Sequence, residues 1–184
     1  MKLFKNRKFA VLITVVVIVL VTLISVNRSL TRLSRDIERM FYDGVYLDSE
    51  RYTQPGIDSQ VTKHADATLG LVTVLKNYPE LHDDSEVVLQ LRRNLLDAGN
   101  IGDKSSAFWK MSGNVNDLVL AASGVDLSDR DMEAVLQYSS TISGAEAFIR
   151  GSAYNQTASE QWNEQSSITH VLSLLLPVRA PDMF

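Results

Sequence analysis

The chain has 184 residues, with 18 Lys and Arg, 22 Asp and Glu, no Cys and a formal net charge of −4. This length favours a single domain, and the lack of cysteine excludes disulfides, Cys-ligated metal sites and a thiol nucleophile. Residues 1–35 hold seven Lys and Arg and no acid, whereas the remaining residues hold eleven against all 22 acids. An acidic body lacks the basic footprint that nucleic acids require, so we expect no nucleic-acid partner.

A long apolar stretch follows a basic tail at residues 1–8. Residues 9–27 carry no formal charge, and thirteen of these nineteen are Val, Ile or Leu. A helix of that length covers roughly 28 Å, close to the hydrocarbon thickness of a bilayer. A buried core helix is a poor alternative at this position, directly behind four basic residues. The sequence therefore predicts a transmembrane anchor at residues 9–27.

Two further properties of the anchor follow from its flanks. The apolar stretch is longer than that of a cleavable signal, and residues 23–28 contain no Ala-x-Ala site, so we expect an uncleaved anchor. Four basic residues precede the span, but Arg28, Arg32 and Arg35 follow it closely, and the charge bias therefore separates the two orientations only narrowly. The free amino group and the first acids favour a single-pass protein of the cell membrane, with a cytoplasmic N-terminus and an extracytoplasmic body.

Residues 28–57 are predicted to form a juxtamembrane helix and a loop. Apolar residues at intervals of three and four continue the helix to about Tyr42, where Asp43 and Gly44 break it. Asp58 is expected to cap a helix that runs toward Tyr78, before Pro79. Its apolar stripe comprises Val61, Ala65, Thr68, Val72 and Leu75.

Two more helices complete the predicted bundle domain, residues 58–176. Apolar spacing persists from residue 84 to 122, which favours one continuous helix across Gly99 and Gly102 over two shorter helices. Ser128 is expected to cap a last helix that runs past His170, before a tail at residues 177–184. Its apolar stripe comprises Met132, Leu136, Ile142, Ala145, Ile149 and Ala153. Because no alternating strand pattern is present, we expect an all-α fold, with an N-terminal transmembrane helix followed by an antiparallel bundle of long helices.

Several motifs occur in a fixed order along the chain. The membrane span is followed by Leu69 to Tyr78, then by Tyr154-Asn155, Trp162-Asn163 and a Pro-containing tail that ends in Phe184. This order resembles that of the LemA family of bacterial membrane-anchored proteins. The residues that match the family motifs are Val72, Lys76, Tyr78, Tyr154, Asn155 and Asn163, and we interpret them as structural. Trp162-Asn163 comes eight residues after Tyr154-Asn155 instead of seven, which turns the second pair about 100° around a helix.

The resemblance implies an N-terminal anchor, an antiparallel helical bundle and no established enzymatic activity. In the family, genes often lie beside membrane-linked proteolysis or other envelope proteins, which implies a partner of that kind.

Little in the sequence indicates chemistry. His82, Asp83 and Asp84 could ligate a cation, but acids at a helix N-terminus are explained by the helix dipole. His64 lies beside an apolar stripe, which favours a partly buried polar contact over a catalytic base. No phosphate loop, dinucleotide fingerprint or hydrolase motif occurs, so we expect no catalytic residue, no metal and no cofactor.

These observations favour a non-enzymatic scaffold or protein-interaction module of the bacterial cell envelope. Its partner would be another membrane or envelope protein, contacted by Phe108, Trp109 and Trp162 if these aromatic side chains are exposed. The alternative is a membrane-anchored sensory bundle that binds a small ligand or cation between its helices.

Overall fold

The computed structural model describes residues 7–48, 50–168 and 182–184, and they form two compact units. The apolar-helix unit comprises residues 1–38 and 158–181, and the bundle unit comprises residues 39–157 and 182–184. Helix α1 (Arg7–Asp43) begins in the first unit and ends in the second. Its N-terminal part is long and apolar enough to cross a membrane, and none of its most apolar stretch is buried.

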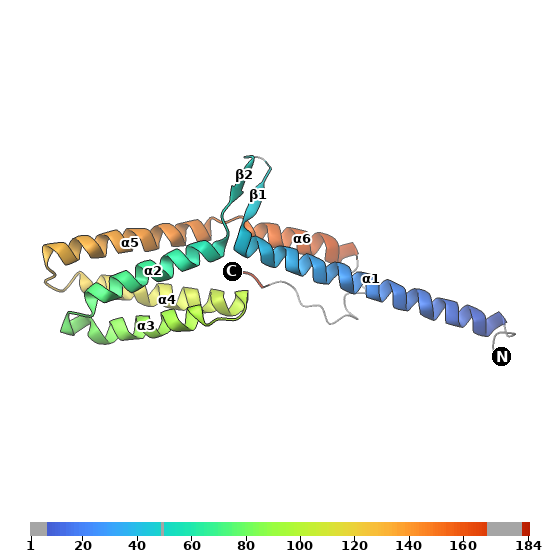
Figure 1. Cartoon of the computed structure of the whole chain (residues 1–184), viewed down its shortest axis with the longest axis horizontal. Coiled ribbons are helices and arrows are strands. Elements are labelled where there is room, and N and C mark those ends of the chain that lie inside the picture. Colours follow the sequence, from blue (N-terminus) through green and yellow to red (C-terminus); the bar gives the residue numbers. More distant parts are fainter. Residues whose placement is uncertain (1–6, 49, 169–181) are drawn as a thin grey trace. The chain divides into compact units, whose positions relative to one another are not determined.

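The bundle unit contains helices α2 (Ile57–Leu75), α3 (His82–Leu96), α4 (Ile101–Ala122) and α5 (Asp129–Arg150). Consecutive helices run antiparallel, and α2 packs most extensively against α5 while α3 packs against α4 (Figure 1). A single 3₁₀ turn, Pro79–Leu81, joins α2 to α3. This arrangement confirms the predicted all-α class with helices packed in antiparallel pairs.

The core of the bundle follows the predicted apolar stripe of α2. All five of its positions are buried, from Val61 to Leu75. The predicted stripe of α3 and α4 is also buried in nearly every position, including Phe108 and Met111, which are fully covered. Periodicity identified these faces because a helix buries residues spaced by three and four.

The predicted continuous helix over residues 84–122 is wrong, because the chain turns between α3 and α4. Helix α3 ends at Leu96, and the Asn100 side chain caps α4 by accepting a hydrogen bond from the Asp103 N–H at 2.8 Å. Apolar spacing survived the turn because Leu95 and Ile101, on either side of it, are both buried in the same core. Local spacing therefore carried no information about the change of direction.

The predicted single last helix is also interrupted. Helix α5 ends at Arg150, and a new helix, α6 (Tyr154–Ile168), begins after Gly151 and Ser152. Ser128 caps α5 as predicted, accepting a hydrogen bond from the Asp131 N–H at 3.2 Å. The expected extension past His170, and most of the tail at residues 177–184, lie outside the described residues.

The first two positions of the stripe predicted for α5 are wrong. Met132 and Leu136 are exposed, and the buried residue between them is Val135. Ile142, Ala145 and Ile149, further along the predicted stripe, are buried.

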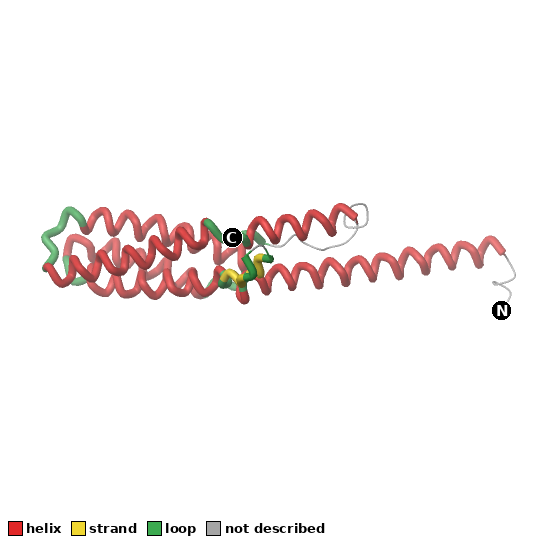
Figure 2. The backbone as a smooth tube through the Cα atoms, turned by 90° about the horizontal axis from the view of Figure 1, so that it is seen from above, coloured by secondary structure: helices red, strands yellow, loops and turns green. Residues whose placement is uncertain are grey.

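The predicted loop at residues 43–57 contains a short hairpin that sequence inspection missed. Strands β1 (Val45–Leu47) and β2 (Tyr52–Gln54) pair antiparallel, with Tyr46 opposite Thr53. Three residues per strand are too few to show an alternating pattern. The hairpin stands at the end of the bundle where α2 begins (Figures 1 and 2).

The sequence predicted Asp58 as the N-cap of α2, but the N-cap is Gly56. A Cβ atom at Gly56 would lie 2.2 Å from the Tyr42 carbonyl oxygen, so only glycine allows the end of α1 to approach this closely. Asp58 instead lies in the first turn of α2, where its carboxylate accepts a hydrogen bond from Lys104 Nζ at 2.7 Å.

Candidate functional site

The last described residues, 182–184, lie at the end of the bundle where α2 and α4 begin (Figures 1 and 2). The Asn155 side-chain amide pairs with the backbone of Phe184, donating to its carbonyl oxygen at 2.6 Å and accepting from its N–H at 2.9 Å. The Tyr154 hydroxyl donates to the Asp182 carbonyl oxygen at 3.0 Å. Two adjacent side chains of α6 therefore hold the backbone of Asp182 and Phe184, and we call these contacts the tail clamp.

The ring of Phe184 completes an aromatic cluster with side chains of α1 and α4. Its centroid lies 5.4 Å from that of Phe41, 5.4 Å from that of Phe108 and 6.5 Å from that of Trp109. Tilted and edge-on ring pairs at such distances contribute about 0.5–1.5 kcal/mol each beyond the burial of their area. The tail clamp thus combines backbone hydrogen bonds with ring contacts to one aromatic side chain.

Two cationic side chains lie over rings of this cluster. Lys104 Nζ is 5.7 Å from the ring centroids of both Phe41 and Tyr42. The Arg150 guanidinium carbon lies 4.3 Å from the Trp109 ring centroid. Cations favour the electron-rich faces of aromatic rings, so these contacts stabilise the cluster.

The Asp182 side chain lies at the N-terminus of α4. Its Oδ2 accepts a hydrogen bond from the Gly102 N–H at 3.4 Å, and a Cβ atom at Gly102 would lie 3.2 Å from the carboxyl carbon of Asp182. The first turn of a helix has unpaired N–H groups and the positive end of the helix dipole. An acidic residue two positions before the aromatic ring is therefore matched to this end of the bundle.

Strand β2 fixes the position of the clamp residues. Gln54 Oε1 accepts hydrogen bonds from the Ala153 N–H at 2.9 Å and from the Ser152 hydroxyl at 3.4 Å. These contacts hold the chain at the start of α6, immediately before Tyr154 and Asn155. The hairpin thereby positions the two side chains that contact the tail.

A second group of polar residues lies inside the bundle, between α2, α4 and α5. His64 is fully buried, and its Nε2 lies 3.3 Å from Glu146 Oε1 while its Nδ1 lies 3.3 Å from the Thr68 hydroxyl. Ser112 donates a hydrogen bond to the same Glu146 oxygen. Burial lowers the pKa of His64 below its ordinary value, and the nearby Glu146 carboxylate opposes that shift only in part.

The order of these side chains differs from that of a hydrolytic triad. In a triad the histidine lies between the hydroxyl and the carboxylate, so that it can take the hydroxyl proton. Here Glu146 lies between Ser112 and His64, and it accepts from both. The group links three helices through satisfied polar atoms, as buried polar groups require.

The three aromatic residues predicted as partner contacts have different surroundings. Phe108 is fully buried, so it does not meet the condition of exposure. Trp109 is half-buried at the rim of the aromatic cluster, and Trp162, in the apolar-helix unit, is also half-buried.

The family-motif residues fall into two groups. Tyr154 and Asn155 form the tail clamp, Val72 is buried in the core, and the Tyr78 hydroxyl donates to Asp131 Oδ2 at 2.7 Å. Lys76 and Asn163 are exposed.

Sequence inspection did not connect several residues of these sites. Phe184 and Tyr154-Asn155 were each singled out as motif elements, but nothing in the linear pattern indicated that they touch. Ser112 and Glu146 were missed altogether. The signal that could have found them is a polar residue at a position of the apolar stripe, because Ser112 directly follows the buried Met111.

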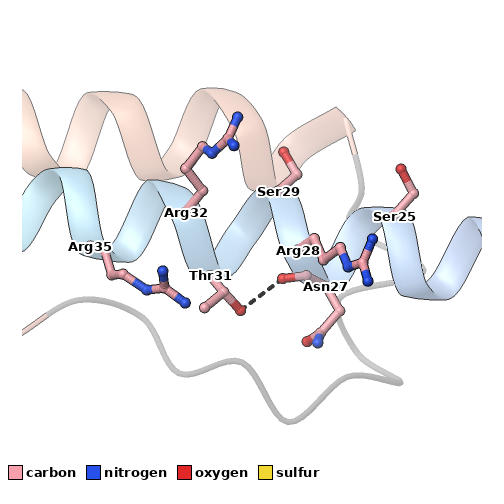
Figure 3. Close-up of a pocket in the computed structure, with 7 residues that line it drawn as sticks. All are labelled: Ser25, Asn27, Arg28, Ser29, Thr31, Arg32 and Arg35. Carbon is pink, nitrogen blue, oxygen red and sulfur yellow. Dashed lines mark hydrogen bonds between the residues drawn. The ribbon is translucent and has the colours of Figure 1, made fainter.

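One pocket lies along α1 in the apolar-helix unit. Its volume is about 610 Å³. Figure 3 shows its lining side chains on successive turns of α1, and they are Ser25, Asn27, Arg28, Ser29, Thr31, Arg32 and Arg35. All three arginines are exposed.

A shallower groove of about 530 Å³ lies between α2 and α5. Its lining includes Lys63 and Asp66 of α2 and Tyr138 of α5. His82, Asp83 and Asp84 form the first turn of α3, and within the described residues no group of three His, Asp or Glu could hold a metal ion.

Comparison with known proteins gave no match to any family model, curated protein or solved structure.

Proposed function

We propose that this protein is a non-enzymatic, membrane-anchored module that binds partner proteins in the bacterial cell envelope, and that it is a divergent member of the LemA family. The observation that carries the proposal is the tail clamp, in which α6 side chains at the end of the bundle bind the backbone of Asp182 and Phe184. Two motif elements of the resemblance, Tyr154-Asn155 and the closing aromatic Phe184, meet there. The group of Ser112, Glu146 and His64 lacks the order that nucleophilic catalysis requires, which supports a non-enzymatic role.

The chemistry of the clamp defines the partner segment. Asn155 and Tyr154 bond to backbone atoms, which any sequence offers, whereas the aromatic cluster and the N-terminus of α4 select side chains. Domains that bind extended peptides work in the same way, with backbone bonds for affinity and pockets for specificity. The partner is therefore an extended segment of a membrane or envelope protein, with an acidic residue two positions before an aromatic one.

A peptide-binding measurement tests this function on the full chain in detergent. The probe is a fluorescent, amidated peptide with the sequence of residues 178–184, and the protein carries Phe184→Ala to weaken its own tail. We expect saturable binding to this variant and much weaker binding to the wild type, whose clamp is occupied. A control peptide with Ala in place of its last Phe should not bind.

The double variant Asn155→Ala/Phe184→Ala should not bind the peptide, because it lacks the Asn155 side-chain amide that pairs with the peptide backbone. Circular dichroism of both variants must show unchanged helicity. If the peptide binds neither the wild type nor Phe184→Ala, the tail only closes the fold and the proposed function is wrong.

The proposed location places the N-terminus in the cytoplasm and the bundle outside. Because the chain has no cysteine, Ser140→Cys, at an exposed position of α5, gives a single label site. Intact cells treated with a membrane-impermeant maleimide should be labelled at this residue and not at Lys2→Cys. Labelling of Ser140→Cys only after lysis would place the bundle in the cytoplasm and redirect the search for partners.

The groove between α2 and α5 favours a second candidate, a sensory bundle that binds a small polar ligand. Lys63 supplies a positive charge and Asp66 a negative charge to this groove, and Tyr138 supplies a ring and a hydroxyl. A ligand that binds only the folded state raises the melting temperature. The absence of any shift across a broad metabolite and cation screen would remove this candidate.

A further inference from the structure

The three arginines that follow the apolar stretch share one face of α1. Arg28, Arg32 and Arg35 are spaced by four and three residues, so they stand one above another on the helix surface. At about 100° per residue, Leu30 and Ile37 lie roughly opposite this stripe, and both are buried. The arginine stripe, defined by these three residues, is therefore on the face of α1 that points away from the buried side.

The height of the stripe matches the polar layer of a bilayer. Arg28 is the first residue after the uncharged stretch at 9–27, and the stripe extends roughly 10 Å along the helix. The headgroup layer of one leaflet is about 5–8 Å thick. Long arginine side chains adjust their height by several ångströms, so all three guanidinium groups reach this layer.

The surroundings of the stripe fit a phosphate group. Hydroxyl-bearing Ser25 and Ser29 line the same pocket, so hydrogen-bond donors lie beside the charges. The first acidic residue of the chain comes only after the stripe, at position 36. Within the described residues, no ion pair joins any of the three arginines to a carboxylate.

We propose that Arg28, Arg32 and Arg35 bind the phosphate of an anionic phospholipid in the leaflet that α1 leaves. Guanidinium groups hold phosphate oxygens through paired hydrogen bonds, and arginines that are exposed and have no acidic partner among the described residues keep their donors available. The inference rests on the proposed membrane anchor, but not on the tail clamp.

Lipid retention by the full chain tests this site. The protein is purified in detergent with equimolar phosphatidylglycerol and phosphatidylcholine, and the retained lipids are counted by native mass spectrometry. The wild type should prefer phosphatidylglycerol. The variant Arg28→Gln/Arg32→Gln/Arg35→Gln should lose that preference, by about fivefold for each arginine removed.

A matched control removes the same charge from the bundle surface. Arg93→Gln/Lys110→Gln/Arg130→Gln changes three exposed cations and should retain the preference of the wild type. Equal loss in both triple variants would reduce the effect to net charge and overturn the site. Displacement of the lipid by excess inorganic phosphate would identify a free-phosphate site instead and overturn the lipid assignment.

Carbonate extraction of membranes separates this proposal from the proposed anchor. If the wild type and the stripe variant both stay in the membrane fraction, the anchor holds, and the lipid ratio alone decides the stripe. If the wild type is washed off, the anchor itself is wrong. No preference for phosphatidylglycerol in a wild type that stays in the membrane would overturn the stripe and leave the anchor intact.

Discussion

Helices α1 and α2 are both rich in Val and Leu, but α1 exposes most of these side chains whereas α2 buries most of them. Val17 and Leu20 of α1 are 51% and 52% exposed, whereas Val72 and Leu75 of α2 are 0% exposed. Helix α2 has polar residues opposite its apolar stripe, which suits a helix packed on one side and wet on the other. The N-terminal half of α1 is apolar all round, which suits a helix whose surroundings are apolar on every side.

Two helices of similar composition are therefore stabilised in different ways. The bundle unit depends on close packing of side chains, so it is sensitive to lost volume. As a proposed membrane anchor, the apolar half of α1 depends on the absence of charge, and it should be insensitive to the shape of individual side chains. Substitutions that remove one of these requirements should therefore affect one region and leave the other unchanged.

The largest effect is expected in the bundle core. Phe108→Ala removes a fully buried ring that lies 4.8 Å from the His64 ring and 5.4 Å from the Phe184 ring. We expect the free energy of unfolding of the bundle to fall by about 3–5 kcal/mol. Thermal and urea unfolding in detergent, followed by circular dichroism, measures this loss.

Leu120→Ala on the same helix is the matched control, because Leu120 is 73% exposed. It should change the unfolding free energy by less than about 0.5 kcal/mol. Membrane retention of Phe108→Ala should equal that of the wild type. A stable Phe108→Ala variant would show that the packing of this core does not depend on the ring.

The second effect is expected in α1. Val17→Arg puts a charge in the middle of the apolar stretch, where insertion into a membrane then costs about 2.5–3.5 kcal/mol more. We expect less protein in the carbonate-resistant membrane fraction and an unchanged melting temperature of the bundle. Val17→Leu keeps the residue apolar and should insert like the wild type. Full insertion of Val17→Arg would contradict the membrane environment inferred for this half of α1.

These two predictions use the part of the fold that the sequence determines well. The transmembrane candidate and the stripe of α2 were identified because both depend on local spacing and composition. The breaks between α3 and α4 and between α5 and α6 were not, since buried residues such as Leu95 and Ile101 kept the spacing across the turn. The tail clamp could not be predicted, because it joins Phe184 to Asn155 across 29 positions.

The third effect concerns the buried histidine and depends on pH. Because burial lowers the pKa of His64, the folded chain binds this proton at a lower pH than the unfolded chain, in which the pKa keeps its ordinary value of 6.5. Between the lowered pKa of the folded chain and 6.5, the unfolded state holds more protons than the folded state. The free energy of unfolding therefore decreases as the pH falls through this range. One such group gives a slope of at most about 1.4 kcal/mol per pH unit.

Urea unfolding between pH 7.5 and pH 5 measures this slope. His64→Gln should reduce it, whereas His82→Gln, which changes an exposed histidine, should leave it unchanged. A wild-type stability that rises as the pH falls would mean that Glu146 dominates and holds His64 charged in the fold.

The smallest effect separates the tail clamp from the core to which it is attached. Tyr154→Phe keeps the buried ring, which lies 5.8 Å from that of Phe41, and removes only the hydroxyl that donates to the Asp182 carbonyl. A neutral hydrogen bond contributes about 0.5–1.5 kcal/mol, so the tail should be released roughly two- to tenfold more often. Hydrogen exchange of the Phe184 amide, which donates to Asn155, reports this release.

Tyr46→Phe, at a tyrosine that is 60% exposed, should leave the exchange unchanged. Faster exchange at Phe184 without a lower melting temperature would show that the clamp opens while the bundle stays folded, as a site that exchanges its own tail for a partner must do.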